Sequence, residues 1–206
     1  MKDIKLINEY NANLIQIRKD ITNDPSNKKF IDIGYSPLYF VSATSKILII
    51  GQAPGLKAQV NNIAWDDLSG DNLRKWLGVT KEEFYNEKLF GIIPMDFFYP
   101  GRGKSGDLPP RLEFAQKWHP LILNNLIDVK LIILMGQYAL KYYLGDQIKS
   151  NLTETVKNYQ NYLPKYLPLV HPSPRNNIWQ AKNPWFINDV IPTLQKIVKK
   201  IIKESL

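Results

Sequence analysis

Lys46-Ile-Leu-Ile-Ile50, closed by Gly51, is a short, almost entirely apolar run rich in β-branched side chains. Such a run fits a buried strand of a parallel sheet that is covered on both faces. Two further runs have the same character, Leu89-Phe-Gly-Ile-Ile93 and Lys130-Leu-Ile-Ile-Leu-Met135. A fourth, Tyr166-Leu-Pro-Leu-Val170, contains a proline that cannot donate to a ladder, which predicts an edge position or a strand end.

Helical patterns lie between these runs. Near the amino terminus, apolar residues recur at steps of three and four from Ile4 to Ile21, as expected of an amphipathic helix packed on a core. The alternation of strands and helices predicts an α/β fold, a three-layer α/β/α sandwich with a central, mostly parallel four-stranded sheet. The other helices are expected over residues 71–77, 80–86, 111–127, 137–144 and 188–203.

The chain has 206 residues, enough for one substantial core, and no repeat or long linker divides it. We therefore expect a single domain over residues 1–206. Its parts are an N-terminal helix and lead-in over 1–45, a core over 46–190 and a C-terminal helix over 188–204.

The composition limits the classes of protein. A net charge of +8 is typical of proteins that bind phosphate backbones, although scattered lysines that keep a protein soluble give the same balance. The chain has no cysteine, which excludes disulfides, thiolate metal sites and cysteine-ligated iron–sulfur clusters. We expect no cofactor and no metal. Without a signal peptide or an apolar run of roughly 18 residues, we expect a cytoplasmic protein that does not bind membranes.

Two unusual loops follow predicted strands, where open α/β sheets place their sites. The first is Gly51-Gln52-Ala53-Pro54-Gly55, whose glycines allow close approach to a ligand, although a tight turn has the same composition. The second is His171-Pro-Ser-Pro-Arg-Asn176, in which two prolines stiffen the backbone around a histidine. A neutral imidazole held there can donate one directed hydrogen bond to developing negative charge, whereas a lone histidine at a strand end is more often structural.

Together, in this order and at this separation, the two loops resemble the uracil-DNA glycosylase superfamily. There a GQDPYH-, GMNPG- or GEAPG-type loop opens the site and an HPS-type loop closes it. The HPSPRN form looks most like the single-strand-selective (SMUG-type) branch, and GQAPG looks closer to the thermostable iron–sulfur branch, whose cluster this cysteine-free chain cannot hold. The segment ending LIILMGQYALKYYLG at Gly145 is similar to the element before the second motif, and the resemblance covers about residues 46–190.

The resemblance implies a DNA-repair enzyme that extrudes a damaged base and cuts its N-glycosidic bond. His171 would donate to the oxyanion of the departing base, and Ser173 would contact a phosphate. Trp65 would stack on the base and Asp96 would read it, although core packing for Trp65 and a cap or salt bridge for Asp96 are equally consistent with the sequence. The first loop would complete the base pocket with Gly51, Gln52, Ala53, Pro54 and Gly55.

Ala53 departs from the family's pattern. It stands where the most active branch has a water-activating aspartate and the SMUG-type branch an asparagine. Because alanine cannot orient water, either another carboxylate does so or activity is weak. Asp66, Asp67 and Asp71 follow closely; we expect Asp67 first and Asp66 next as the catalytic carboxylate, with N-capping of a helix as the alternative role.

Two segments suit DNA. The basic, glycine-rich loop over residues 100–106 offers backbone N–H groups and the cations Arg102 and Lys104 to phosphates, and it lacks the first glycine of a P-loop. After the second motif, Arg175 and Asn176 are expected to contact DNA. The side chain that fills the gap left by the extruded base is expected to be Ile178 or Trp179, with Arg175 a further candidate. His119 is expected to be structural.

The leading hypothesis is a monofunctional, metal-free DNA glycosylase that acts, as a monomer, on DNA containing uracil or a related deaminated base in base excision repair. One alternative is a catalytically weak or inactive nucleic-acid-binding member of the same fold, in which Ala53 would mark the loss of catalysis. The other is a nucleotide-processing α/β hydrolase whose basic loops bind small phosphates.

Overall fold

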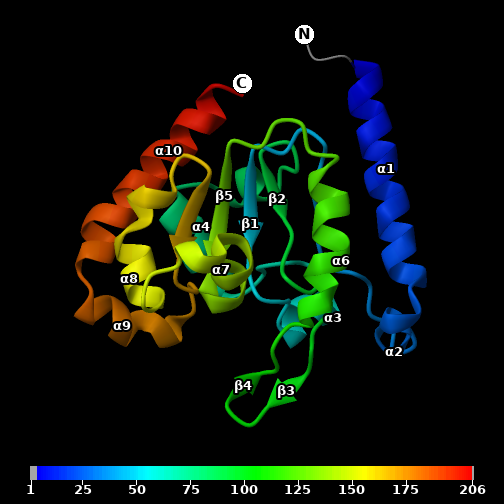
Figure 1. The fold of residues 1–206 in the computed structure, drawn as a ribbon, viewed down its shortest axis with the longest axis horizontal. Coiled ribbons are helices and arrows are strands. Elements are labelled where there is room, and N and C mark those ends of the chain that lie inside the picture. The colour runs from blue at the N-terminus through cyan, green and yellow to red at the C-terminus, as the bar shows by residue number, and fades with distance from the viewer. Residues whose placement is uncertain (1–3, 206) are drawn as a thin grey trace.

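The four apolar runs form one sheet in the computed structural model, which describes residues 4–205 (Figure 1). The strands lie in the order β2-β1-β5-β6, and every neighbouring pair is parallel. The α/β class and the four-stranded sheet are thereby confirmed, and β6 is an edge strand. The bounds are β1 (Ile47–Ile50), β2 (Phe90–Ile92), β5 (Leu131–Met135) and β6 (Tyr166–Leu169).

Alternate residues of β1 enter two different cores, which makes the fold three-layered. Ile47 and Ile49 pack in the same cluster as Leu194, whereas Leu48 and Ile50 pack with Leu14 and other residues of the opposite layer. Both faces of the sheet are apolar because helices cover both. One layer contains α1 (Ile4–Asn23), α2 (Lys28–Ile31), α6 (Leu112–Leu123) and α7 (Gly136–Leu144).

The other layer packs on the opposite face (Figure 1). It contains α3 (Leu56–Asn61), α4 (Leu68–Leu77), α5 (Lys81–Phe84), α8 (Leu152–Lys157), α9 (Asn177–Lys182) and α10 (Ile191–Lys203). Helices α3, α8 and α9 are short and were not expected from the sequence, because six residues are too few to establish a helical period.

Two of the helix ends that differ from the sequence expectation lie near a proline. The helix expected over 111–127 ends at Leu123, one turn after Pro120. The C-terminal helix begins as a π-helical turn over Phe186–Val190, just before Pro192 near the start of α10. Because Pro192 has no N–H, the i→i−4 ladder lacks one bond there, and the π-helical turn just before it accommodates the missing bond.

A short hairpin projects from the body at the lower edge of Figure 1. Its strands are β3 (Arg102–Gly103) and β4 (Gly106–Asp107), paired antiparallel with Arg102 opposite Asp107. The sequence predicted a basic loop here rather than a hairpin.

Among residues 4–205, no helix is long and apolar enough to cross a membrane.

His119, in α6, is structural, as expected, and is fully buried. Its Nε2 is 2.9 Å from the carbonyl oxygen of Pro94 and its Nδ1 is 2.6 Å from the hydroxyl of Tyr143. Because a carbonyl only accepts, Nε2 carries the proton and Nδ1 accepts from Tyr143. The imidazole therefore fixes the segment that contains Pro94, which lines the cavity described below.

Burial gives the protein a pH-dependent stability through His119. Burial lowers the pKa of His119 from 6.5 to about 4. As the pH falls through this interval, the unfolded chain binds a proton that the folded chain does not, so the free energy of unfolding decreases; above pH 6.5 the contribution is complete. Urea unfolding at a series of pH values should show this decrease. A His119→Gln variant should be less stable at neutral pH and depend less on pH; an unchanged pH dependence would contradict the assignment.

Candidate active site

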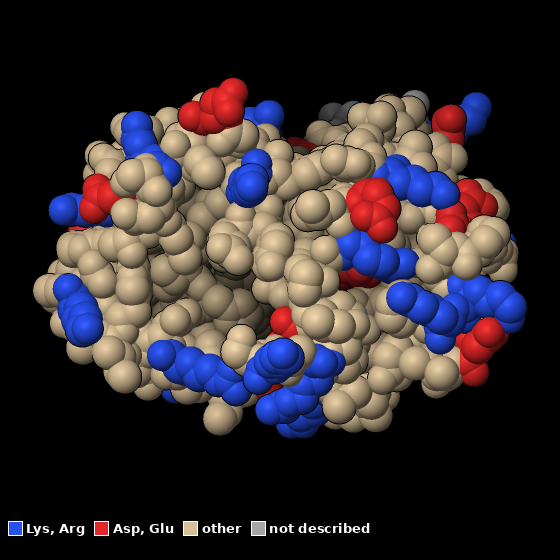
Figure 2. All heavy atoms as spheres, turned by 60° about the horizontal axis from the view of Figure 1, so that its bottom comes forward, with Lys and Arg blue, Asp and Glu red and all other residues tan. Residues whose placement is uncertain are grey.

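A cavity of about 600 Å³ opens at the carboxyl ends of β1, β2 and β6. Figure 2 shows the hollow on this face of the molecule, with Lys and Arg side chains along part of its rim. Both loops singled out in the sequence reach it, although more than a hundred residues separate them. Most of the predicted site residues line this cavity. They are Gly51, Gln52, Ala53, Pro54, Gly55, Trp65, Asp67, Arg102, His171, Ser173, Arg175 and Asn176.

The first loop is tied to the segments beside it. The N–H groups of Met95 and Asp96 donate to the carbonyls of Gly51 and Gln52, at 2.8 and 3.1 Å. The side-chain amide of Gln52 donates to the carbonyl of Leu108 at 3.1 Å, just after the β3–β4 hairpin. Gln52 therefore fastens the base of the hairpin to the loop that contains Ala53.

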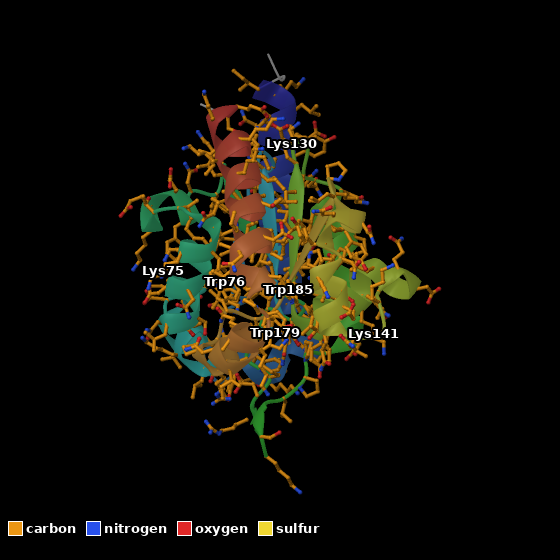
Figure 3. All side chains as sticks on the ribbon, turned by 90° about the vertical axis from the view of Figure 1, so that its left-hand side faces the viewer. Lys75, Trp76, Lys130, Lys141, Trp179 and Trp185 are labelled. Carbon is orange, nitrogen blue, oxygen red and sulfur yellow. The ribbon has the colours of Figure 1, made fainter. Side chains whose placement is uncertain are left out.

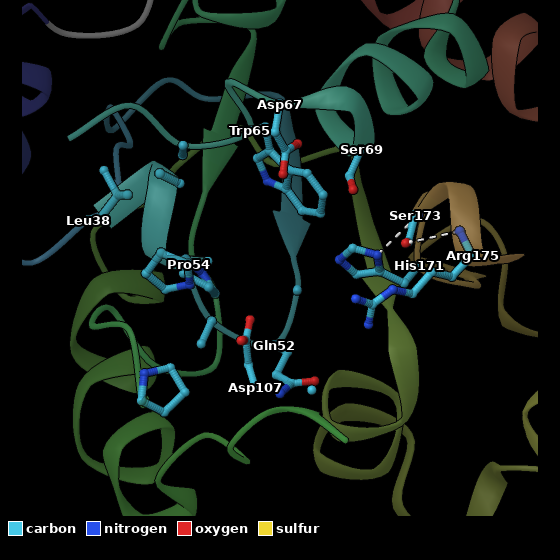
Figure 4. Close-up of a pocket in the computed structure, with 18 of the residues that line it drawn as sticks. Leu38, Gln52, Pro54, Trp65, Asp67, Ser69, Asp107, His171, Ser173 and Arg175 are labelled. Carbon is cyan, nitrogen blue, oxygen red and sulfur yellow. Dashed lines mark hydrogen bonds between the residues drawn. The ribbon is translucent and has the colours of Figure 1, made fainter. Parts of the chain in front are cut away.

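Trp65 lies between the two loops (Figure 4). Its ring centroid is 5.4 Å from that of His171, with a 33° angle between the planes. Its backbone φ is 60°, a left-handed conformation that is uncommon for a bulky residue. Arg74 stabilises it, because Nη1 donates to the Trp65 carbonyl at 3.1 Å. The ring thus forms one wall of the cavity, and its predicted stacking on a base stays a prediction.

Gly70 is required by the backbone at Trp65. A Cβ atom at position 70 would lie 1.7 Å from the carbonyl oxygen of Trp65, which cannot move freely because Arg74 binds it. We expect Gly70→Ala to lower the free energy of unfolding by about 3 kcal/mol, at the upper end of overpacking costs. Thermal or urea unfolding measures this. Gly55→Ala, where nothing lies within 4 Å of the added atom, should cost less; equal losses would contradict the steric argument.

The second loop fixes the tautomer of His171. The backbone N–H of Ser173 donates to Nδ1 of His171 at 3.2 Å. Since Nδ1 accepts, the neutral imidazole carries its proton on Nε2. In Figure 4 this second nitrogen faces into the cavity, away from Ser173. The geometry therefore presents one N–H donor to whatever occupies the cavity.

The charge state of His171 is set by burial and by two carboxylates. Burial lowers the pKa of His171, and the negative charges of Asp67 and Asp107 oppose this effect. Because the net shift is downward from 6.5, the imidazole is neutral at neutral pH. A neutral donor is suited to stabilising a developing anion without giving up its proton.

Further contacts hold the second loop in place. The amide of Asn72, on α4, donates to the carbonyl of Pro172 at 3.1 Å, and the amide of Asn176 donates to the carbonyl of His171 at 2.7 Å. The hydroxyl oxygen of Ser173 accepts from the N–H of Arg175 at 3.3 Å, so its own proton points elsewhere. The loop is thus positioned by α4 and by its own side chains.

Asp96 does not lie in the cavity, which corrects its expected role in reading the base. Its carboxylate is fully buried and is held by Arg111, whose Nε and Nη2 donate at 2.7 and 2.9 Å. The N–H of Phe98 donates to the same carboxylate at 3.1 Å. With both oxygens engaged, Asp96 is a structural ion-pair partner.

The three aspartates near Trp65 have different positions. Asp66 forms an ion pair with Lys81 at 3.2 Å and does not line the cavity, which corrects its assignment as a second catalytic carboxylate. Asp71 forms an ion pair with Arg74 at 2.6 Å. Asp67 lines the cavity and also caps α4, accepting from the N–H of Gly70 at 2.8 Å.

The structure separates the two candidates for the intercalating side chain. Trp179 lies against Trp185 and Phe186, with ring centroids 5.7 and 5.4 Å away, and its indole N–H donates to Thr153 at 2.9 Å. Figure 3 shows Trp179 and Trp185 close together near the start of α10. Trp179 therefore packs in the fold and is not available as a wedge. Ile178 is 71% exposed and stays the candidate for the intercalating side chain.

Lys104 is exposed on the β3–β4 hairpin, outside the cavity lining.

Several residues of the cavity lining were not among the predicted site residues, and Ser69 and Asp107 are two of them that have polar side chains. Ser69 follows Asp67 in α4, and Asp107 lies on β4, where its Oδ1 accepts from the hydroxyl of Tyr99 at 3.3 Å. The only signal for Asp107 in the sequence was its place at the end of the glycine-rich loop, where Arg102 and Lys104 were the residues predicted to bind a ligand. Within residues 4–205, no group of three or more His, Asp or Glu side chains is arranged to hold a metal ion.

The fold and the site define a class of protein, an α/β domain with a neutral histidine facing an aromatic wall at the carboxyl ends of parallel strands. A family model described as the Uracil DNA glycosylase superfamily matches residues 38–195, more than half of the chain. The chain belongs to this superfamily. The match extends beyond the span of the resemblance found in the sequence and includes both loops of the cavity.

Proposed function

We propose that the protein is a monofunctional DNA glycosylase that removes uracil or a related deaminated base in base excision repair. Membership of the superfamily supports a glycosylase activity of the uracil-DNA type. The observation that carries the finer proposal is the Nε2–H of His171, which faces the cavity because the N–H of Ser173 occupies Nδ1.

The cavity suits an extruded base. Glycosylases rotate the target nucleotide out of the stack and hold the base between apolar and aromatic side chains. Trp65 and Pro54 supply such surfaces, and His171 supplies the donor for an oxygen of the departing base. When the C1′–N bond breaks, negative charge develops on that base, and a preorganised donor in a buried site stabilises it.

The surroundings of the cavity suit DNA rather than a free nucleotide. Arg102 and Arg175 line it, and Lys104 is exposed beside it on the hairpin. These cations come from two separate loops, an arrangement that follows an extended phosphate backbone. Ile178 is 71% exposed just after the second loop, which supports its proposed role of filling the space left by the base.

The proposal specifies a glycosylase without a lyase step. A lyase attacks the sugar with an amine, most often a lysine, to form a Schiff base. None of the described residues that line the cavity is a lysine. We therefore expect an intact abasic strand as the product.

Labelled oligonucleotides that contain uracil, hypoxanthine, xanthine or a mismatch test the proposal. After incubation with the protein, strand scission should appear only once alkali is added, and it should be about 10²–10³-fold slower with His171→Ala. DNA binding without scission for every base would instead favour the inactive binding member of the fold. Hydrolysis of free nucleotides with little salt-dependent DNA affinity would favour the nucleotide hydrolase.

A further inference from the structure

We propose that Asp107, on the β3–β4 hairpin, is the catalytic carboxylate that holds and deprotonates the attacking water. The inference rests on the proposed glycosylase function and names a residue of that same site. It replaces the expectation that Asp67 has this role.

Asp107 faces the reacting region from the hairpin. It lines the same cavity as His171, and its negative charge acts on the imidazole. In Figure 4 it lies near Gln52, across the cavity from Trp65 and Asp67. The two carboxylates therefore lie on different sides of the space that a base and its sugar would occupy.

The hairpin brings Asp107 to the loop that lacks a carboxylate. Gln52 precedes Ala53, and its amide donates to Leu108, the residue after Asp107, at 3.1 Å. Residue 107 is thereby held beside the loop of Ala53, whose methyl group cannot bind water. A hairpin carboxylate supplies here the function that the side chain at position 53 cannot.

Asp67 and Asp107 differ in the hydrogen bonds that they already accept. One oxygen of Asp67 accepts the N–H of Gly70 at 2.8 Å, so this side chain is held in the N-cap geometry of α4. The hydrogen bond that Asp107 accepts comes from the phenol of Tyr99 and is longer, 3.3 Å. Within residues 4–205, no hydrogen bond reaches Oδ2 of Asp107, which leaves that oxygen to a water molecule.

The reaction is balanced with water as the only co-reactant. The C1′–N bond breaks and its electron pair stays on the base, while His171 donates a hydrogen bond to that anion without losing its proton. The water oxygen bonds to C1′, and Asp107 accepts the proton that the water releases. Asp107 then returns this proton to solvent, and the base anion takes one up, so that one water molecule is consumed.

Single-turnover cleavage of the uracil oligonucleotide by saturating enzyme tests the inference. Asp107→Asn should slow cleavage by about 10²-fold or more, the usual contribution of a general base, with DNA affinity and thermal stability close to those of the wild type. Asp67→Asn keeps a good N-cap residue and removes the same charge, so it is the matched comparison and should lose much less. Asp32→Asn, an exposed carboxylate paired with Lys28, controls for net charge.

Chemical rescue separates a catalytic from a structural role. Azide attacks C1′ without having to lose a proton and leaves a 1′-azido sugar, so it should restore the release of free uracil by Asp107→Ala but not by His171→Ala. The released base is the quantity measured, because alkali does not cut the strand at the azide adduct. Asp107→Asn at the wild-type rate, an Asp67→Asn loss larger than that of Asp107→Asn, or no rescue by azide would each overturn the inference. A wild type that binds but cuts none of the oligonucleotides would overturn the proposed function itself.

Discussion

Replacing His171 by alanine is expected to slow cleavage of a uracil-containing oligonucleotide by about 10²–10³-fold, the usual cost of losing one preorganised donor to an oxyanion. The Nε2–H would no longer meet the charge that develops on the base, whereas the loop itself would persist because Asn72 still holds Pro172. Single-turnover rates measure the effect, and DNA affinity should change little.

The pH dependence of the same reaction provides a control. Because burial lowers the pKa of His171, the neutral donor is already present at neutral pH, and raising the pH further should not remove it. At acidic pH the imidazole gains a second proton on Nδ1, which then confronts the N–H of Ser173. A histidine contribution that increases with protonation, seen as a wild-type to His171→Ala ratio that grows as the pH falls, would contradict the neutral-donor mechanism.

Replacing Arg111 by methionine is expected to lower the free energy of unfolding by about 3–5 kcal/mol, because it leaves a buried carboxylate without its partner. Asp96 is fully buried, and Arg111 supplies two of its hydrogen bonds from the side chain. The guanidinium also donates to Asn27 at 2.8 Å, which joins the segment after α1 to the site region. Urea or thermal unfolding measures the loss.

The double variant Asp96→Leu/Arg111→Met tests whether an unpaired buried charge causes the loss of stability in Arg111→Met. If the loss comes from an unpaired buried charge, removing the charge as well should recover part of the stability, since an apolar pair often replaces a buried ion pair at little cost. A double variant no more stable than Arg111→Met would show instead that packing of Arg111 over Phe30 and Phe114 dominates, because both variants have lost that packing.

The sheet could be predicted from the sequence because its strands are buried on both faces. The runs at residues 47–50 and 131–135 are apolar without interruption, a pattern that few other structures produce. The short helices and the β3–β4 hairpin could not be predicted in this way. Arg102-Gly103 and Gly106-Asp107 have neither an apolar face nor a period, so their pairing depends on tertiary contacts such as the Gln52–Leu108 hydrogen bond.

The two loops of the site could be predicted because parallel strands place their carboxyl ends at one edge. The individual carboxylates could not. Neither Asp96 nor Asp107 is marked in the sequence by its distance from the two loops. In the structure Asp96 is buried in an ion pair with Arg111, whereas the hairpin brings Asp107 to the cavity. Trp179 was misassigned for a related reason, since its partners Thr153 and Trp185 lie on other segments of the chain.

The orientation of the His171 proton is encoded in the main chain. The donor to Nδ1 is a peptide N–H, so no ordinary change of side chain at position 173 removes it. Proline is the exception, because its ring nitrogen bears no hydrogen. A substitution at position 173 can therefore change the side chain that lines the cavity while the imidazole continues to direct its Nε2–H into that cavity.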